Sequence, residues 1–89
     1  MRAVITVLGT DRVGIIAGVS ATLAETNVNI LDITQTIMQG IFTMIMVVDI
    51  GMANISFEEL DQRLKAKSEA LGLQIRIQRE DIFNSMHRI

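Results

Sequence analysis

Apolar and polar residues recur with two different periods along the chain, and the points where the period changes mark the borders of the expected elements. The run Ala3–Thr10 is short and rich in β-branched residues, which is typical of a buried strand. From Val13 to Ala24 the apolar residues recur at helical spacing. The runs Asn27–Met38 and Ile41–Ile50 again have the character of strands, and Gly40 between them predicts the tight turn of a hairpin.

A second helix and a fourth strand follow the hairpin. Ser56 and Glu59 have the spacing of a capping box, and Gly72 is typical of a residue that ends a helix, so a helix is expected between them. The segment Leu73–Arg79 alternates apolar and polar residues, as a strand with one solvated face does. In residues 80–89 the apolar side chains return to helical spacing, which predicts a short amphipathic helix at the C-terminus.

The predicted order of elements, βαββαβ, is that of the ferredoxin-like fold. This is an α+β architecture in which right-handed crossovers place both helices on one face of a four-stranded antiparallel sheet. The first and third strands lie in the middle of such a sheet. We expect residues 1–79 to form this domain and residues 80–89 to form a C-terminal helical tail.

The expected third strand is apolar on both faces. One face carries Phe42, Met44, Met46, Val48 and Ile50, and the other carries Ile41, Ile45 and Val47. The helices can cover only one of these two faces. At roughly 25 cal/mol per Å² of apolar surface, leaving these side chains in water costs several kcal/mol, a large part of the stability of a small domain. We therefore expect the C-terminal tail and a second copy of the sheet both to contribute to covering the open face, so that the protein is a homodimer. The alternative is a tail that folds back on its own monomer and covers the face alone.

Composition limits the kinds of partner. The chain has 89 residues, enough for one domain, and a net charge of −2. Nucleic acids and anionic membranes are bound through clustered Lys and Arg, so neither is expected as a partner. The absence of cysteine excludes disulfides and thiolate chemistry. No apolar run approaches the ~20 residues of a membrane-spanning helix, and the expected location is the cytoplasm.

Two groups of side chains resemble metal ligands only in type. Glu58, Glu59 and Asp61 lie in the first turn of the second helix, where Glu59 belongs to the cap and the other two are expected to face water. His87 has no second histidine and no cysteine to complete a site. We therefore expect no metal, no cofactor and no catalytic triad.

The stretch "GTDRVGI", Gly9–Ile15, joins the first strand to the first helix and is the most distinctive motif of the chain. Asp11 is predicted to be the N-cap of the helix. A Walker loop would need Lys and Ser or Thr directly after Gly14, where two isoleucines stand. A dinucleotide site would bring pyrophosphate against the Asp11 carboxylate. Metal carriers of this topology need Cys-x-x-Cys here, and RNA-binding domains need strand aromatics, but the chain has no Tyr or Trp.

One enzyme interpretation stays open as a remote alternative. Acylphosphatases share this topology and bind phosphate with an Arg in this loop, while an Asn on a neighbouring strand positions water. Arg12 and Asn29 could take these roles. The loop lacks the glycine- and valine-rich sequence of that family, and the Asp11 carboxylate would repel phosphate.

A small zwitterion suits the loop better. Gly14 leaves room where a ligand would approach, and the N–H groups of the first helical turn can bind a carboxylate. The Asp11 carboxylate can accept hydrogen bonds from an ammonium group, and Asn29 offers both a donor and an acceptor. These groups together predict a free amino acid as the ligand.

The chain resembles the ACT domain, a regulatory module attached to many enzymes of amino-acid metabolism. The resemblance rests on "DRVGI" at Asp11–Ile15, on "NVNI" at Asn27–Ile30, on the βαββαβ order and on Gly40 in the hairpin. It covers the chain except the tail. The short length and the ending "DIFNSMHRI" are most similar to the small stand-alone ACT proteins, each of which is like half of the glycine-cleavage repressor.

The resemblance implies a ligand held between two domains, by the loop after the first strand of one and the start of the second strand of the other. Carried over by position, the implied residues are Asp11, Arg12, Val13, Gly14 and Ile15, with Asn29 and Ile30 from the partner. The serine-binding form of the motif has His at the position of Gly9, Asn at that of Asp11 and Pro at that of Val13, so the identity of the amino acid is open.

We therefore expect a non-catalytic regulatory module that homodimerises and binds an amino acid at the subunit interface. Its effect would be exerted on a metabolic enzyme or a regulator. The alternative is an interaction domain that dimerises or docks on another protein without any ligand.

Overall fold

The computed structural model describes residues 1–10 and 13–81 and has the βαββαβ order that the sequence predicts. The elements are β1 (Arg2–Thr10), α1 (Ile15–Glu25), β2 (Asn29–Met38), β3 (Ile41–Asp49), α2 (Phe57–Leu71) and β4 (Gln74–Arg79). The hydrophobic pattern therefore identifies every element in this part of the chain and misplaces about half of the ends by one or two residues.

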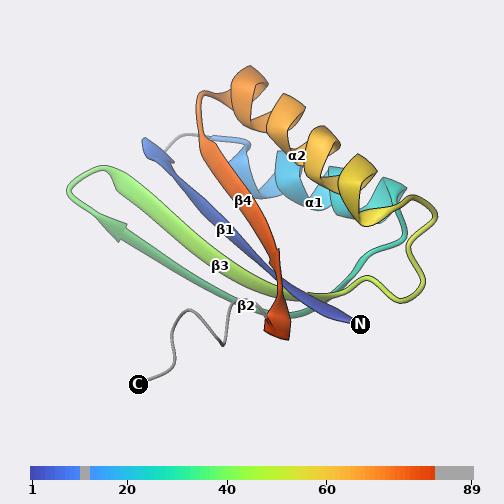
Figure 1. The fold of residues 1–89 in the computed structure, drawn as a ribbon. Helices are drawn as coiled ribbons and strands as arrows, with labels where there is room; N and C mark the ends of the chain where they lie inside the picture. The colour runs from blue at the N-terminus through green and yellow to red at the C-terminus, as the bar shows by residue number, and fades with distance from the viewer. Residues whose placement is uncertain (11–12, 82–89) are drawn as a thin grey trace.

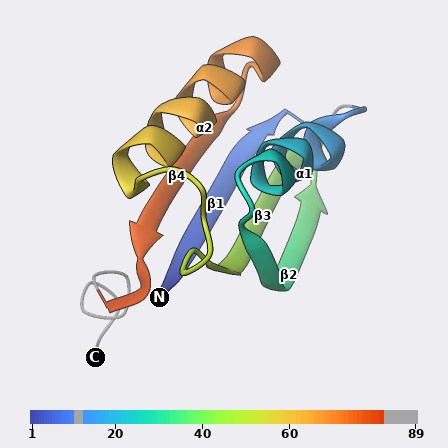
Figure 2. The ribbon, with the colours of Figure 1, turned by 90° about the vertical axis from the view of Figure 1, so that its right-hand side faces the viewer.

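The four strands form one sheet in the order β2-β3-β1-β4, and neighbouring strands are antiparallel. Both helices pack on the same side of this sheet (Figure 1). In the side view of Figure 2, α2 lies toward β4 and α1 lies toward β2. The predicted ferredoxin-like fold, with β1 and β3 in the middle of the sheet, is confirmed.

The core lies between the helices and the two central strands. Ile5 pairs with Met46, and Val7 pairs with Met44, across the β1–β3 ladder. All four side chains are fully buried. The helices add buried residues at helical spacing, namely Ile15, Val19 and Leu23 from α1 and Leu60 and Leu64 from α2. The two methionines thus fill the core.

Both predicted ends of α2 are confirmed. The Ser56 hydroxyl accepts a hydrogen bond from the Glu59 N–H at 3.2 Å, which satisfies one of the free donors at the helix start. At the other end Gly72 has a φ of 67°, in the left-handed region that glycine adopts without strain. The N–H of Leu73 then donates to the carbonyl of Ser68 at 2.8 Å and closes the last turn.

The start of α1 differs from the prediction. The helix begins at Ile15 and its N-cap is Gly14, so the predicted start at Val13 and the predicted N-cap at Asp11 are both wrong. The reason is the φ of Gly14, which is 95° and is incompatible with a right-handed helix. The helix can therefore begin only after Gly14. Asp11 itself lies outside the described residues.

The face of the sheet that points away from the helices carries exposed apolar side chains, as the pattern of β3 predicts. Ile41 is 54% exposed and Ile45 is 40% exposed. Leu8 of β1, which pairs with Thr43 and so lies on the same face, is also 40% exposed. The predicted C-terminal helix falls almost entirely on residues 82–89, which lie outside the described residues.

The cap of α2 gives a stability prediction. Ser56→Ala removes the hydroxyl that accepts the Glu59 N–H, so the variant should lose about 1 kcal/mol of unfolding free energy. Urea denaturation followed by far-UV circular dichroism measures the loss. Ser56→Asp is the matched control, because Asp is an equally good N-cap and should keep the midpoint nearly unchanged. Equal stability of the Ala variant and the parent would contradict the cap.

Candidate ligand-binding site

The loop after β1 ends in an open turn formed by Val13 and Gly14. Val13 is fully exposed, whereas Ile15 directly after the turn is buried and anchors α1 to the core. No atom outside the immediate chain neighbours lies within 4 Å of the place where a Cβ of Gly14 would stand. The turn therefore leaves its backbone accessible. Asp11 and Arg12, the other predicted residues of this loop, lie outside the described residues.

The first turn of α1 offers backbone donors at this place. The first intrahelical bond runs from the Gly18 N–H to the Gly14 carbonyl at 2.8 Å. The N–H groups of Ile15, Ile16 and Ala17 precede it and have no acceptor within the helix. Such donors, at the positive end of the helix dipole, suit a carboxylate.

The second glycine of the motif has a different role. A Cβ at Gly9 would overlap Cδ2 of Leu73 and lie 3.4 Å from its Cα. Gly9 therefore allows the start of β4 to pack closely against the end of β1, whereas Gly14 supplies the left-handed turn. The two glycines of "GTDRVGI" thus serve packing and backbone geometry respectively.

Asn29 lies at the opposite end of the sheet from Gly14. Asn29 pairs with Asp49 of β3, and Asp49 pairs with Arg2, the first residue of β1. Gly14, in contrast, lies in the loop that follows Thr10, the last residue of β1. The length of β1 between these ends is about 26 Å at a rise of about 3.3 Å per residue. One chain therefore does not bring the two groups of predicted ligand residues together.

Strand β2, which begins at Asn29, is an uncovered edge of the sheet. All ten of its residues are exposed. Ile30 pairs with the buried Val48 and therefore points to the helix side of the sheet, and Ile33 and Ile37 share that face. The helices stop short of these side chains, so an apolar stripe lies open beside α1.

A cavity of about 380 Å³ opens next to Asn29. Its lining consists of Ala24, Asn27, Val28, Asn29 and Met52. The Asn27 amide donates to the carbonyl of Met52 at 2.7 Å and joins the α1–β2 junction to the loop after β3. The sequence motif "NVNI" includes Asn27, but no local signal indicates that Met52, on a distant loop, completes this cavity.

Comparison with known proteins identifies the family. Residues 2–78 match the family model of the ACT domain. The chain belongs to the ACT domain family.

This ACT domain is similar over its whole length to a UPF0237 protein of Listeria innocua, with 55% identity over 89 residues and 100% of each chain covered. An ACT domain protein from Streptococcus pneumoniae has a similar structure, with a TM-score of 0.81, 42% identity and 93% of each chain covered. A putative glycine cleavage system transcriptional repressor matches with a TM-score of 0.74 and 25% identity, over 88% of this chain and 44% of that one. The predicted resemblance to half of such a repressor is confirmed.

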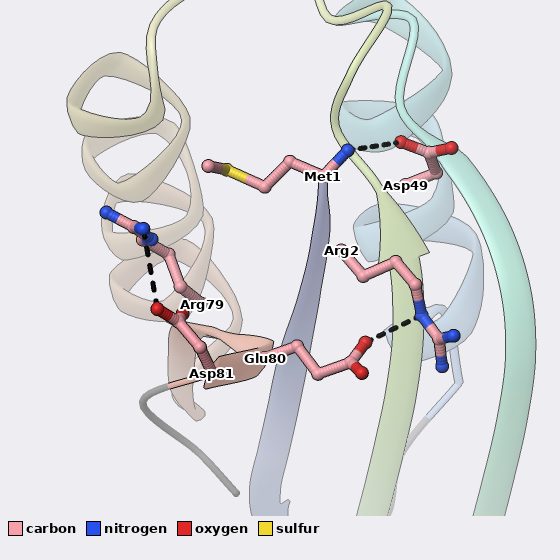
Figure 3. Close-up of a pocket in the computed structure, with 6 residues that line it drawn as sticks. All are labelled: Met1, Arg2, Asp49, Arg79, Glu80 and Asp81. Carbon is pink, nitrogen blue, oxygen red and sulfur yellow. Dashed lines mark hydrogen bonds and ion pairs between the residues drawn. The ribbon is translucent and has the colours of Figure 1, made fainter. Parts of the chain in front are cut away.

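A second cavity of the ACT domain, of about 550 Å³, lies at the Arg2 end of the sheet (Figure 3) and was not foreseen from the sequence. Its lining consists of Met1, Arg2, Asp49, Arg79, Glu80 and Asp81. Ion pairs join Arg2 Nε to Glu80 Oε2 at 2.6 Å, the Met1 amino group to Asp49 Oδ1 at 3.4 Å, and Arg79 Nη2 to Asp81 Oδ2 at 3.5 Å. Because each charge faces an opposite one, the cluster neutralises itself and does not favour a charged ligand.

Within residues 1–10 and 13–81, no group of three or more His, Cys, Asp or Glu side chains is arranged to hold a metal ion. No helix in this part of the ACT domain is long and apolar enough to cross a membrane. The chemistry that the candidate site offers here is hydrogen bonding by backbone N–H groups and by side-chain amides.

The Asp49 carboxylate gives a pH prediction. The Gly51 N–H donates to it at 2.8 Å and the Met1 amino group lies 3.4 Å away, and both lower the pKa of Asp49 from its usual 3.8. Because the pKa is lower in the folded state, the stabilisation is present above a pH of about 4 and is lost as the pH falls through the folded pKa. Asp49→Asn should therefore be less stable than the parent at pH 7, and the difference should shrink below pH 4.

Urea midpoints of both proteins between pH 7 and pH 2 measure this effect. A difference that stays constant over the whole range would show that the substitution acts through packing, and would contradict an ionised Asp49 as the stabilising group.

Proposed function

We propose that this ACT domain is a non-catalytic regulatory module that forms a homodimer and binds a free amino acid between its two subunits. The binding residues are Asp11, Arg12, Val13, Gly14 and Ile15 of one subunit with Asn29 and Ile30 of the other. The observation that carries the proposal is the distance of about 26 Å that separates the two groups within one chain, since a ligand as small as an amino acid can reach both only across two chains.

The exposed edge of β2 supports dimerisation at that strand. An edge strand with unpaired backbone groups is a template for pairing with another chain unless charges or Pro protect it. The other edge, β4, is protected by exposed Arg76 and Arg79. In contrast, β2 carries a single charged residue, Asp32, and exposes large apolar side chains, namely Ile30, Leu31, Ile33, Ile37 and Met38. A second copy that pairs with β2 would cover them.

The expected symmetry of such a dimer supports a shared site. A two-fold axis makes the two copies of β2 antiparallel, so the Asn29 end of one copy lies beside the Met38 end of the other. Met38 pairs with Ile41 of β3, and Ile41 pairs with Thr10 of β1. The loop 11–15 follows Thr10, so it lies at the Met38 end of the sheet. The pairing thus moves Asn29 and Ile30 of one subunit toward the loop of its partner.

The chemistry of the two groups complements an amino acid. The first-turn N–H groups of α1 can donate to the ligand carboxylate, and the Asp11 carboxylate can accept from its ammonium group. The Asn29 amide can donate to the carboxylate or accept from the ammonium group. Gly14 leaves the approach free, because beyond its chain neighbours no atom lies within 4 Å of the place where its Cβ would stand.

Regulation follows from linkage between ligand and dimer. A ligand that binds only the dimer stabilises it by mass action, so the concentration of the amino acid sets the fraction of dimer. The similarity to a putative glycine cleavage system transcriptional repressor supports a regulatory role in amino-acid metabolism. The recipient of the signal would be a metabolic enzyme or regulator in the cytoplasm.

One alternative is a ligand-free interaction domain. It is favoured by the apolar edge of β2, which could drive dimerisation without a ligand.

The acylphosphatase interpretation is disfavoured. Arg12 follows Thr10 by two residues, whereas Asn29 lies at the other end of β1, about 26 Å away. A phosphate held by Arg12 would therefore be out of reach of Asn29 of the same chain.

A thermal-shift screen of the full chain against the twenty amino acids tests ligand binding. An amino acid at a hundred times its Kd should add about 2.7 kcal/mol to the stability, which raises Tm by several degrees in a domain of this size. The D-enantiomer of the best ligand is the control and should be weaker. No shift with any amino acid would favour the ligand-free alternative.

A complementation experiment tests whether the site is shared. Asp11→Ala and Asn29→Ala should each abolish binding of the amino acid found in the screen. Co-refolding equal amounts of the two variants should restore about a quarter of the sites, because half of the dimers are mixed and one of their two sites has both groups intact. Isothermal titration calorimetry measures the number of sites. A mixture that stays inactive would place both groups in one subunit and overturn the shared site.

A further inference from the structure

We propose that the C-terminal segment, residues 82–89, packs on its own chain across the sheet face that the helices leave open. The acceptor surface is the open-face patch, which we define as Leu8, Ile41, Ile45 and Val47. The inference concerns a surface different from the β2 edge and does not depend on the amino-acid site.

The open-face patch needs a cover. Leu8 and Ile45 are each 40% exposed and Ile41 is 54% exposed, on adjacent central strands. In contrast Val4, which lies on the same face nearer the start of β1, is only 5% exposed. The exposure of the apolar side chains therefore increases along β3 from Val47, which pairs with Val4 and is half-buried, to Ile41 at the far end.

The chain turns toward this face after β4. The β1–β4 ladder ends with Arg79 opposite Ala3, and Glu80 and Asp81 leave the sheet. Ala3 is buried beneath the helices, so the neighbouring Arg2 points to the open face. The Glu80 carboxylate follows it there and pairs with Arg2 Nε at 2.6 Å.

Figure 3 shows the Glu80 side chain crossing β1 on the side away from the helices. The oxygen of this ion pair, Oε2 of Glu80, is buried, although the Arg2 side chain is more than half exposed. This ion pair holds the last described residues at the edge of the open face, so the segment that follows starts next to the patch.

The length and composition of residues 82–89 match the patch. Eight residues span about 12 Å as a helix and about 26 Å when extended. Ile45 aligns with Thr6, which lies about 13 Å along β1 from Arg2, and Leu8 lies about 20 Å away. The apolar members of the segment are Ile82, Phe83, Met86 and Ile89, which fall on one side at helical spacing.

Residues 82–89 of the same chain are favoured over a second sheet as the group that covers the open-face patch, because they are covalently attached to the chain that carries it. A segment joined directly to residue 81 has an effective concentration in the millimolar range, far above that of a separate chain. The β2 edge, moreover, already offers a second copy a larger set of exposed apolar side chains.

Engineered cysteines in the full chain test the proposal, because the natural chain contains none. Met86→Cys is combined with Ile45→Cys in one protein and with Leu8→Cys in another. Under oxidised glutathione at low protein concentration, at least one pair should form a disulfide within one chain, since disulfides need Cα atoms within about 7 Å. Non-reducing electrophoresis and intact mass detect it.

Met86→Cys with Glu58→Cys is the matched control. Glu58 is exposed at the start of α2, on the helix side of the same end of the sheet, and this pair should stay reduced. Disulfides between chains would mean that a second copy provides the cover and would overturn the proposal. So would the absence of any disulfide with Leu8→Cys and Ile45→Cys, or equal oxidation of the control.

A second measurement does not depend on disulfide geometry. Phe83→Ser and Ile45→Ser should each lower the urea midpoint, and the double variant should lose less than the sum of the two losses, because both remove the same contact. Additive losses would contradict contact between the segment and the patch. The slope of each unfolding curve verifies that the variants remain folded.

Discussion

The antiparallel pairing of β3 with both β1 and β2 fixes the direction of every other element and, with it, the place of the candidate site. Two strands that are each antiparallel to the strand between them run parallel to each other. The loop after β1 and the start of β2 therefore lie at opposite ends of the sheet. The motifs "DRVGI" and "NVNI" are close in the sequence because one helix joins them. They are nevertheless far apart in space, because α1 and the turns at its ends lead the chain from one end of the sheet back to the other.

The second constraint is that two helices cover less apolar surface than this sheet presents. They bury the inward side chains of β1, β3 and β4, but they leave β2 exposed at all ten positions and leave the opposite face of β1 and β3 partly bare. A domain of 89 residues has little stability to spare. The β2 edge and the open-face patch are therefore the two surfaces where further contacts would stabilise it most, and they point in different directions.

The sequence predicts well what depends on local patterns. Alternation in Leu73–Arg79 identifies β4, and Ser56 and Gly72 identify the ends of α2, because caps and turns are set by single residues. The N-cap of α1 was mispredicted since Asp11 and Gly14 are both acceptable N-caps, and only the backbone angle of Gly14 decides between them. The two cavities were missed because Asn27 meets Met52, and Arg2 meets Glu80, only through the tertiary fold. The sequence pattern of β2 is that of a covered strand. It therefore did not predict that the side chains of β2 on the helix side of the sheet are exposed.

The ladder of β2 adds a further argument on how a ligand could control association at this edge. The pairing of β2 with β3 shifts register between Ile30 and Asp32, so Leu31 forms an irregularity one residue away from the proposed ligand contacts. A bulge twists an edge strand and interrupts its regular row of donors and acceptors. In the proposed dimer, pairing with a second β2 would then be weakest at the start of the strand, where Asn29 and Ile30 lie. A small molecule bound there would supply contacts that the strand itself cannot make. A ligand shifts an equilibrium only by its differential affinity for the two states. In the proposed dimer, an amino acid would therefore have its greatest effect at such a weak point of the interface.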